Sequence, residues 1–395
     1  MVLVPRTFSI GVIAPEFPPD IGGVETYSFE LARALAALGH RVTVFTIAHR
    51  GGEAELPGVR ILPILRQRRR LDRQLLHTHP IQVWHATNAA YSWLAEETAS
   101  VVLSVHGNDF LKPYVQVARP DIDRLPLLWR LRGRPRDWIT ALDACIGERR
   151  TRRLVARTLP RVSCVVTNSR YTEAVLLERY PGCHGHTSVA LVGVGDHFLR
   201  APLTRRAGGG PARLVTVCRL AERRKNVDLV LRALTELKDR HRFTYTIVGE
   251  GATRGALERL AGELGLGECV RFTGRVSQAE LMAHLGSADL FILTSSTLPS
   301  SHEGFGIAYL EANALGTPVL AARLGGAIEA VEEGVSGMFV DEPTVPQIRA
   351  AIESFLSGGV KFDPARCREF ASRFTWERVA RHFTDCYARV VETRR

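Results

Sequence analysis

Long apolar segments are lacking in this sequence. No run approaches the roughly 18 to 20 apolar residues that a membrane-spanning helix requires. The first apolar stretch, Phe8–Ala14, is short and continues into a polar turn without the small-residue cleavage site of a secretory leader. We therefore expect a cytoplasmic protein.

Cysteine is also scarce. The seven cysteines are odd in number and contain no CxxC pair, so neither a disulfide framework nor a redox motif is indicated. Several lie in apolar runs, where a thiol usually acts as a small hydrophobic side chain. No His/Cys set has the spacing of metal ligands, and we predict neither a metal nor a bound cofactor.

The remaining composition is that of a globular enzyme. Hydrophobic residues make up 45% and charged residues 24% of 395 residues, a length that allows two domains. Lysine supplies only four of the 52 basic side chains, so arginine dominates a net charge of +11. A basic surplus favours anionic partners such as phosphorylated substrates, lipid head groups or nucleic acid.

Short β-rich runs alternate with longer helical patterns, which predicts an α/β fold with parallel sheets. The alternation stops at Leu203–Pro211 and then restarts, so we predict two Rossmann-like domains, 1–202 and 203–375, facing each other across a cleft. The amphipathic C-terminal helix, 376–395, is expected to pack back on the first domain. The predicted strands are Ser9–Ala14, Arg41–Ile47, Val59–Ile64, Ile81–His85, Val101–His106, Ser163–Asn168, Thr187–Val192, Arg213–Cys218, Thr244–Val248, Val270–Thr273, Leu290–Thr294 and Val319–Ala321.

Two motifs follow predicted strands of the first domain. Gly22 and Gly23 form a turn that enters a helix, where backbone N–H groups can approach a phosphate, although a plain turn is the alternative. His106 ends another strand and can face the same crevice, but a lone histidine is more often structural. Neighbouring polar residues that we expect on the acceptor side are Glu25, Thr26, Asn108 and Asp109.

Cations and carboxylates follow the strands of the second domain. Arg219 and Lys225 lie on one strand-to-helix loop and can hold a diphosphate, unless they are simply solvated. The pair Glu303 and Glu311 suits hydrogen bonds from sugar hydroxyls, and the residues between them offer open amides at a helix start: Gly304, Phe305, Gly306 and Ile307. The sequence Gly249–Gly255 could be taken for a dinucleotide fingerprint, but no ribose-binding acid follows it.

Together these motifs resemble the retaining glycosyltransferases of the GT-B type, in family 4 (group 1), over nearly the whole chain. The resemblance implies a nucleotide-sugar donor domain at 203–375 and an acceptor domain at 1–202. Cys218 and Val192 depart from the common pattern. The motifs that carry the resemblance are Pro18–Glu25, His106, Asn168–Thr172, Gly193–Asp196, Arg219, Lys225, Glu303, Glu311, Gly316–Val319 and Gly325–Gly326.

The resemblance also implies roles. Gly23, Arg219 and Lys225 would contact the donor diphosphate of a UDP- or GDP-sugar. Glu303 would bind a donor sugar hydroxyl and Glu311 the nucleotide ribose, while His106 would lie beside the transferred sugar. The acceptor would be a sugar, a lipid-linked or a small molecule, and no nucleic acid is expected.

Two other functions stay open at this point. A sugar-nucleotide epimerase shares the fold and would need additional crevice acids. A non-catalytic nucleic-acid-binding protein would interleave aromatic side chains with its basic residues, and Arg66–Arg73 contains none.

Arginine is concentrated in Leu65–Leu76. If this segment is one helix, four arginines share a face opposite Leu71 and Leu75. That face would attach weakly to anionic lipid at the inner face of a membrane, although an ordinary solvated face is the alternative. The four arginines are Arg66, Arg69, Arg70 and Arg73.

Overall fold

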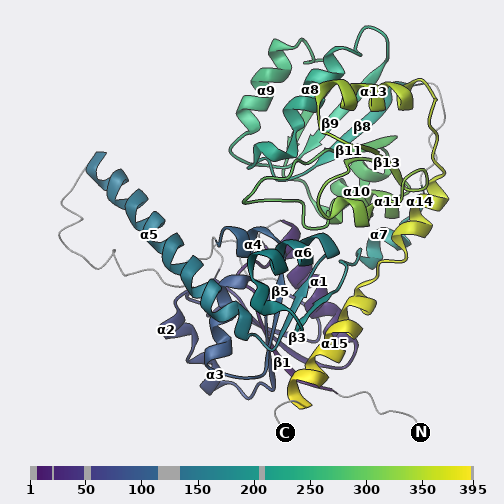
Figure 1. Ribbon diagram of the computed structural model, residues 1–395. Helices are drawn as coiled ribbons and strands as arrows, with labels where there is room; N and C mark the ends of the chain where they lie inside the picture. The colour runs from purple at the N-terminus through teal and green to yellow at the C-terminus, as the bar shows by residue number, and fades with distance from the viewer. Residues whose placement is uncertain (1–6, 20–21, 49–54, 114–133, 204–209, 393–395) are drawn as a thin grey trace, which may run out of the picture. The chain divides into compact units, whose positions relative to one another are not determined.

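The chain folds into two α/β units. The computed structural model describes residues 7–19, 22–48, 55–113, 134–203 and 210–392, with the backbone alone at 134–145. One unit comprises Met1–Leu191 with Glu377–Arg395, and the other comprises Val192–Trp376 (Figure 1). The observed boundary between residues 191 and 192 lies before the predicted one between residues 202 and 203, and the C-terminal helix belongs to the first unit.

The first unit contains a 7-stranded parallel sheet in the order β3-β2-β1-β4-β5-β6-β7. Every strand predicted in this half is present. The strands are β1 Ser9–Ile13, β2 Arg41–Phe45, β3 Val59–Leu62, β4 Val83–Ala86, β5 Val101–Val105, β6 Cys164–Thr167 and β7 Thr187–Val189. The helices are α1 Gly23–Ala37, α2 Arg69–Asp72, α3 Leu75–Thr78, η1 Ala89–Glu96, α4 Asn108–Leu111, α5 Arg134–Thr158, η4 Leu159–Arg161, α6 Arg170–Arg179 and η5 Pro181–Cys183.

The second unit contains a 6-stranded parallel sheet in the order β10-β9-β8-β11-β12-β13. Its last strand, β13, was not predicted. The strands are β8 Ala212–Val217, β9 Phe243–Val248, β10 Val270–Gly274, β11 Leu290–Leu293, β12 Val319–Ala322 and β13 Gly337–Val340. The helices are α7 Asp196–Arg200, η6 Arg223–Lys225, α8 Val227–Thr235, α9 Arg254–Glu263, α10 Gln278–Gly286, α11 Ile307–Ala314, α12 Ala327–Ala330, α13 Val345–Leu356 and α14 Pro364–Ala371.

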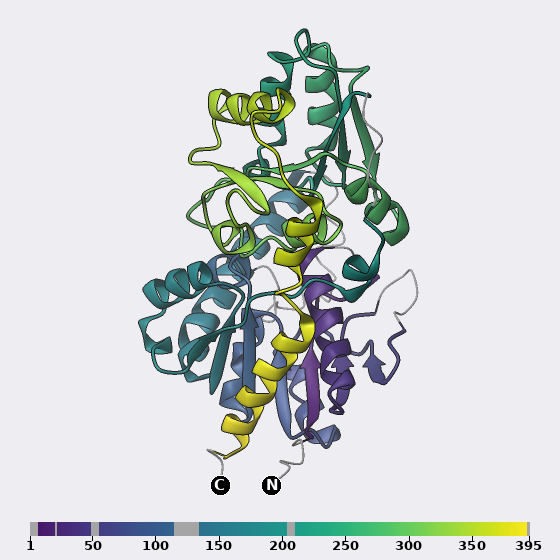
Figure 2. The same cartoon turned by 90° about the vertical axis from the view of Figure 1, so that its right-hand side faces the viewer.

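The helix α15, Trp376–Glu392, completes the first unit (Figures 1 and 2). Its Tyr387 hydroxyl lies 2.7 Å from Nδ1 of His85 on β4, and both residues are fully buried. The ring of Phe383 packs against His85 with centroids 4.6 Å apart. The apolar face of this amphipathic helix is therefore buried on the first sheet. The two residues in contact, His85 and Tyr387, are 302 positions apart in the sequence.

The predicted basic helix over Leu65–Leu76 is wrong. Gln67 has a φ of 54°, and two separate four-residue helices, α2 and α3, take its place. Asp72 is buried and accepts hydrogen bonds from the backbone N–H groups of Arg66 and Arg68 at 2.8 and 3.1 Å, which holds the chain in a turn. Leu71, which a single helix would place opposite the arginines, is 44% exposed.

The arginines of this segment are also not one free basic face. Arg69 forms ion pairs with Glu96 at 2.8 Å and Glu97 at 3.0 Å, and its guanidinium lies over the ring of Trp93. Arg73 pairs with Glu97 at 3.5 Å. The segment therefore does not form the single helical face on which the predicted attachment to lipid depended. Among the described helices, none combines the length and the apolar character that crossing a membrane demands.

Candidate active site

The strand order of the second sheet reverses between β8 and β11, which are neighbours in the sheet. An open parallel sheet leaves a crevice at such a point, outside the carboxyl ends of its strands. The loop after β8 carries Arg219 and Lys225, and the loop after β11 carries Glu303. The topology therefore brings the predicted cations and carboxylate to one edge.

Asn226 fastens these two loops together. It has a left-handed backbone conformation with a φ of 55°, which asparagine tolerates better than most residues. Its side-chain amide donates to the Thr294 carbonyl oxygen at 2.6 Å and contacts the Ser296 hydroxyl at 2.8 Å. The N–H of Ser296 in turn donates to the Arg224 carbonyl oxygen at 2.7 Å. Asn226 is a supporting residue whose role the sequence did not reveal.

The carboxylate of Glu303 is the centre of a charged cluster. Its Oε2 accepts a hydrogen bond from Lys225 Nζ at 2.6 Å and another from the Ser295 hydroxyl at 3.2 Å. Arg224 Nη1 lies 3.5 Å from the same oxygen. Three contacts thus converge on one oxygen of the Glu303 carboxylate.

Charge and burial act in opposite directions on Glu303. Burial alone raises the pKa of this carboxyl, but Lys225 and Arg224 more than offset it and lower the pKa to about 2. Glu303 is therefore ionised at neutral pH. A carboxylate held in this state accepts hydrogen bonds but does not act as an acid.

Arg224 precedes Lys225 and was not among the residues singled out from the sequence. Its side chain is only 5% exposed, and its Nε donates to Glu222 Oε2 at 2.5 Å. The hydroxyl of Ser301 donates to the same Glu222 oxygen at 2.9 Å. Arg224 thus links the loops after β8 and β11 through two carboxylates, and a buried guanidinium of this kind is kept only when paired.

The start of α11 has the predicted form. Gly306 precedes the helix with a φ of 95°, and a Cβ there would lie 2.3 Å from the Tyr309 ring, so only glycine fits. Phe305 is buried, whereas Ile307 and Glu311 are half-buried. The first amides of α11 lack acceptors within the helix, as at any helix start.

Gly325 and Gly326 shape the loop of Glu303 from behind. The N–H of Gly326 donates to the Glu303 carbonyl oxygen at 2.8 Å. A Cβ on Gly326 would lie 2.0 Å from the Gly304 carbonyl oxygen, and one on Gly325 would lie 2.8 Å from that of Glu303. A side chain at either glycine would displace the carboxylate loop.

The glycines of Gly249–Gly255 have a structural explanation. A Cβ on Gly249 would lie 2.0 Å from the Cys218 carbonyl oxygen, and one on Gly251 would lie 2.2 Å from that of Leu220. The N–H of Leu220 donates to the Glu250 carbonyl oxygen at 2.8 Å. These glycines let the loop after β9 pack directly on the loop that carries Arg219.

In the first unit, α1 begins at Gly23 after a Gly22 turn. Gly22 accepts a hydrogen bond from Thr26 N at 3.0 Å, which leaves the first helical amides without a helical acceptor. A Cβ on Gly23 would meet no atom within 4 Å among the described residues. Glu25, predicted on the acceptor side, is 6% exposed, and Thr26 is half-buried.

His106 follows β5 and lies beside α1. Its ring packs edge-on against Tyr27 with centroids 4.4 Å apart. Burial lowers the pKa of His106 to about 4, so the imidazole is neutral at pH 7. Asp109 is buried, and its two oxygens accept from the N–H groups of His106 at 2.8 Å and Ala89 at 3.0 Å. Asp109 thus supports the histidine loop directly.

Three neutral polar groups near the ends of β5 and β6 have unsatisfied atoms. Nε2 of His106, Oδ1 of Asn108 and Oδ1 of Asn168 are buried without a hydrogen-bond partner in the described part of the chain. Because buried polar atoms are nearly always paired, such a group of orphan atoms indicates a place for a polar ligand or water. Asn168 belongs to a motif that carried the family resemblance and had no assigned role.

A metal centre is not evident in the ranges that the structure describes, where no group of three or more His, Cys, Asp or Glu side chains is arranged to hold an ion. The sequence contains one Asp-x-Asp triplet, Asp121–Asp123, which lies outside the described residues. Activity without a metal therefore stays a prediction.

Two family models match consecutive parts of the chain. "Glycosyltransferase Family 4" matches residues 21–194, and "Glycosyl transferases group 1" matches residues 205–373. A GDP-mannose-dependent α-(1-6)-phosphatidylinositol monomannoside mannosyltransferase of Mycolicibacterium smegmatis is 30% identical over 90% of each chain. The protein belongs to glycosyltransferase family 4. The resemblance that the motifs indicated is thereby confirmed, and the protein is a glycosyltransferase.

This family 4 enzyme is also similar to other proteins. A D-inositol 3-phosphate glycosyltransferase of Catenulispora acidiphila is 28% identical, over 94% of this chain and 91% of its own. Among solved structures, sucrose-phosphate synthase from Thermosynechococcus elongatus aligns with a TM-score of 0.72 and 20% identity over 97% of this chain and 99% of its own. HepE of Anabaena, solved with UDP-glucose, aligns with a TM-score of 0.70 and 17% identity. The alignment covers 96% of this chain and 99% of HepE. The two parallel-sheet α/β domains have the GT-B fold, as predicted.

Proposed function

We propose that this glycosyltransferase moves a sugar from a UDP- or GDP-sugar to a hydroxyl acceptor, with retention of the anomeric configuration. The observation that carries the proposal is the contact of Lys225 with Glu303 at the strand-order reversal of the second sheet, beside buried Arg224. Lys225, which we propose for phosphate, and Glu303, which we propose for sugar hydroxyls, are 2.6 Å apart.

The chemistry requires this combination. Breaking the bond between a sugar and a diphosphate builds positive charge at the anomeric carbon and negative charge on the leaving group. An ammonium has three N–H donors, so Lys225 can bind Glu303 with one and the leaving diphosphate with another. Arg219 on the same loop is the second proposed diphosphate ligand. The leaving phosphate then takes the proton of the acceptor hydroxyl on the same face of the sugar.

Neutral groups are proposed for the acceptor. Imidazole and amide groups such as those of His106, Asn108 and Asn168 can exchange hydrogen bonds with hydroxyls without a charge that would repel or hold a phosphate. The relatives include a phosphatidylinositol monomannoside mannosyltransferase, a D-inositol 3-phosphate glycosyltransferase and a glycogen synthase. Acceptors of these kinds would share sugar-like or polyol hydroxyls, which fits the proposed site. A lipid-linked acceptor would need no membrane-binding helix in this scheme.

The test is a transfer assay with GDP-mannose and UDP-glucose against phosphatidylinositol mannoside, inositol 3-phosphate and a glucan. We expect one donor to give a product with the donor's anomeric configuration, in EDTA as well as in buffer with Mg²⁺. A donor that reacts without any acceptor to give free nucleotide diphosphate and an epimerised sugar would favour the epimerase instead. The proposal would be contradicted if no combination of donor and acceptor gave a product and if neither nucleotide sugar raised the melting temperature of the protein.

A further inference from the structure

A chain of buried hydrogen bonds crosses the core of the first unit. It begins at Tyr387 on α15, whose hydroxyl lies 2.7 Å from Nδ1 of His85 on β4. Nε2 of His85 lies 2.7 Å from the Ser104 hydroxyl on β5, and that hydroxyl lies 3.1 Å from the Tyr27 hydroxyl on α1. None of the four residues is more than 2% exposed, so bulk water does not reach the chain.

The register of the sheet explains how this chain reaches His106. His85 pairs with Val102 in the parallel register of β4 and β5, and Ser104 is two residues beyond Val102. Because side chains alternate along a strand, these three share one face, and His106, which follows β5 directly, is next in that row. The Tyr27 ring packs against the His106 ring with centroids 4.4 Å apart and planes at 72°. The chain therefore ends against the histidine of the candidate site.

The imidazole of His85 makes the chain sensitive to the loss of one member. Burial lowers the pKa of His85 to about 3, so its ring is neutral and has one N–H donor and one acceptor nitrogen. One flanking hydroxyl, of Tyr387 or Ser104, therefore donates to the ring and the other accepts from it. Without the Tyr387 hydroxyl, a buried ring nitrogen would lose its partner, which favours a shift of the ring or of its hydrogen. Either change alters the hydrogen bond to Ser104 and, through it, the place of Tyr27.

We propose that Tyr387 of the C-terminal helix is a positioning residue for His106 and acts through this chain of hydrogen bonds. The inference rests on the proposed function, in which His106 exchanges hydrogen bonds with acceptor hydroxyls. Nε2 of His106 is buried without a hydrogen-bond partner in the described part of the chain, so the direction of this atom depends on how the ring is packed. The last helix thereby acts on the acceptor site without contacting the acceptor.

A second contact between a hydroxyl and an imidazole also holds α15 on the sheet. The Thr384 hydroxyl lies 2.9 Å from Nε2 of His40. Nδ1 of His40 accepts a hydrogen bond at 3.2 Å from the N–H of Phe8, which precedes the amino end of β1. This contact leads away from the carboxyl edge where His106 lies. Thr384→Val therefore removes a contact of the same kind from the same helix without breaking the chain.

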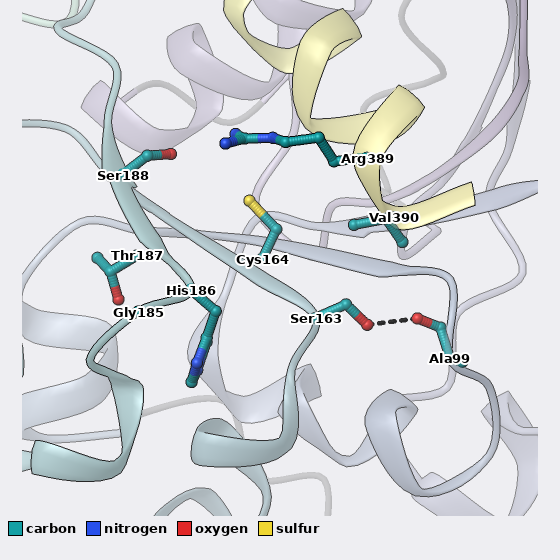
Figure 3. A pocket seen from close by; sticks show the side chains of 9 residues that line it. All are labelled: Ala99, Ser163, Cys164, Gly185, His186, Thr187, Ser188, Arg389 and Val390. Carbon is teal, nitrogen blue, oxygen red and sulfur yellow. Dashed lines mark hydrogen bonds between the residues drawn. The ribbon is translucent and has the colours of Figure 1, made fainter. Parts of the chain in front are cut away.

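A third contact of this kind lies beside a cavity. The Ser188 hydroxyl on β7 lies 3.0 Å from Nε2 of His382 on α15. Ser188 and Arg389 line a cavity of about 360 Å³, and Figure 3 shows their side chains extending toward one another. The cavity lies at the amino ends of β6 and β7 and has room for a water molecule that replaces the hydroxyl. Ser188→Ala is therefore a second control.

The first experiment measures initial rates with donor and acceptor varied in turn. We expect Tyr387→Phe to raise the acceptor KM roughly threefold to tenfold with an unchanged donor KM, and both controls to keep the wild-type values. In a His106→Ala background, Tyr387→Phe should no longer change the acceptor KM, because the side chain that it positions is gone. A further rise in that background, or an equal rise in the controls, would overturn the proposal.

The second experiment does not depend on activity. Protein labelled with ¹³C at histidine Cε1 gives one resonance for each histidine, and His106→Gln identifies that of His106. We expect Tyr387→Phe to shift this resonance and Thr384→Val to leave it in place. Ser104→Ala breaks the chain from β5 and should shift it as well, which decides the question if Tyr387→Phe fails to fold.

The two experiments separate this inference from the proposed function. A His106 resonance that stays in place when the chain is broken would overturn the inference, whatever the kinetics. A resonance that moves while the acceptor KM stays constant would overturn the acceptor role of His106, and thus that part of the proposed function.

Discussion

The carboxyl edges of the two sheets are built from different chemistry. In the second unit, Arg224 and Lys225 are charged and pair with the carboxylate of Glu303. In the first unit, His106 and Asn168 are uncharged and present buried atoms without partners among the described residues. A site for a fixed diphosphate needs charges held in place beforehand. Neutral donors and acceptors without partners in the protein can instead bind the hydroxyls of an acceptor.

Substitutions in the two regions should therefore have different consequences. Changes in the charged cluster alter both stability and the reaction, because each side chain has partners within the protein. Changes among the neutral groups alter acceptor binding with little effect on stability.

Lys225→Ala should lower kcat by roughly 10² to 10³, because it removes charge stabilisation of the leaving diphosphate. Folding should survive, since Arg224 still lies 3.5 Å from Glu303. Steady-state kinetics and a thermal melt measure the two effects. The exposed Lys361 of the same unit gives the control variant Lys361→Ala, and equal rates in both variants would remove Lys225 from the site.

Glu303→Gln should lower kcat and change the pH dependence of stability. The pKa of Glu303 is depressed from 4.5 to about 2, so its stabilisation is complete above pH 4.5 and is lost as the pH falls toward 2. The difference in unfolding free energy between wild type and variant should shrink over that window by an amount on the order of 3 kcal/mol. Urea unfolding from pH 6 to pH 2.5 measures it, and a constant difference would contradict the ion-pair assignment.

Gly23→Ala should lower activity roughly tenfold to a hundredfold while leaving stability unchanged or raised, because a methyl group there meets no atom of the described residues within 4 Å and would obstruct only a ligand. Gly262→Ala on α9 is the matched control, since its Cβ also meets nothing. Two equally active variants would place the diphosphate elsewhere.

Glu311→Ala should raise the donor KM roughly tenfold with a smaller change in kcat, because a ribose contact is present in both the ground state and the transition state. Initial-rate kinetics with varied donor measure it. The reverse pattern, a lowered kcat with an unchanged KM, would mean that Glu303 and Glu311 exchange their proposed roles.

Asn168→Ala should have the smallest effect, a rise of roughly threefold to tenfold in acceptor KM with an unchanged donor KM. Its side chain loses no hydrogen bond to the described residues, so the melting temperature should stay close to that of the wild type. If the donor KM rises instead, the neutral groups do not belong to the acceptor site.

Much of the fold could be predicted from the sequence, because parallel strands and the helices between them have strong local patterns of apolar residues. The strand predicted as Leu290–Thr294 is β11, Leu290–Leu293, for example, since a buried apolar run leaves few alternatives. The strand β13, Gly337–Val340, was not predicted from the sequence. It is short and begins with a glycine that packs on the Val319 carbonyl oxygen.

The site was predictable only where chemistry lies within a motif. Lys225 and Glu303 were singled out separately, and the structure brings them together at 2.6 Å. Arg224 could not be distinguished from other arginines in the sequence. Its burial depends on Glu222 and on the loop that carries Glu303. That loop lies almost eighty residues later, as the separation of 78 between Lys225 and Glu303 illustrates. The prediction of one basic helix over Leu65–Leu76 was wrong for the same reason. The partners of Arg69, Glu96 and Glu97, are remote in the sequence.

The return of α15 to the first unit has a consequence for how the protein is made. A ribosome releases the strands of the first unit long before it has synthesised Phe383 and Tyr387, which cover buried His85. Until then that face of the sheet is not covered by α15, although every residue of the second unit has already been synthesised. Synthesis of the second unit is therefore complete before that of the first, although the first unit begins earlier in the chain.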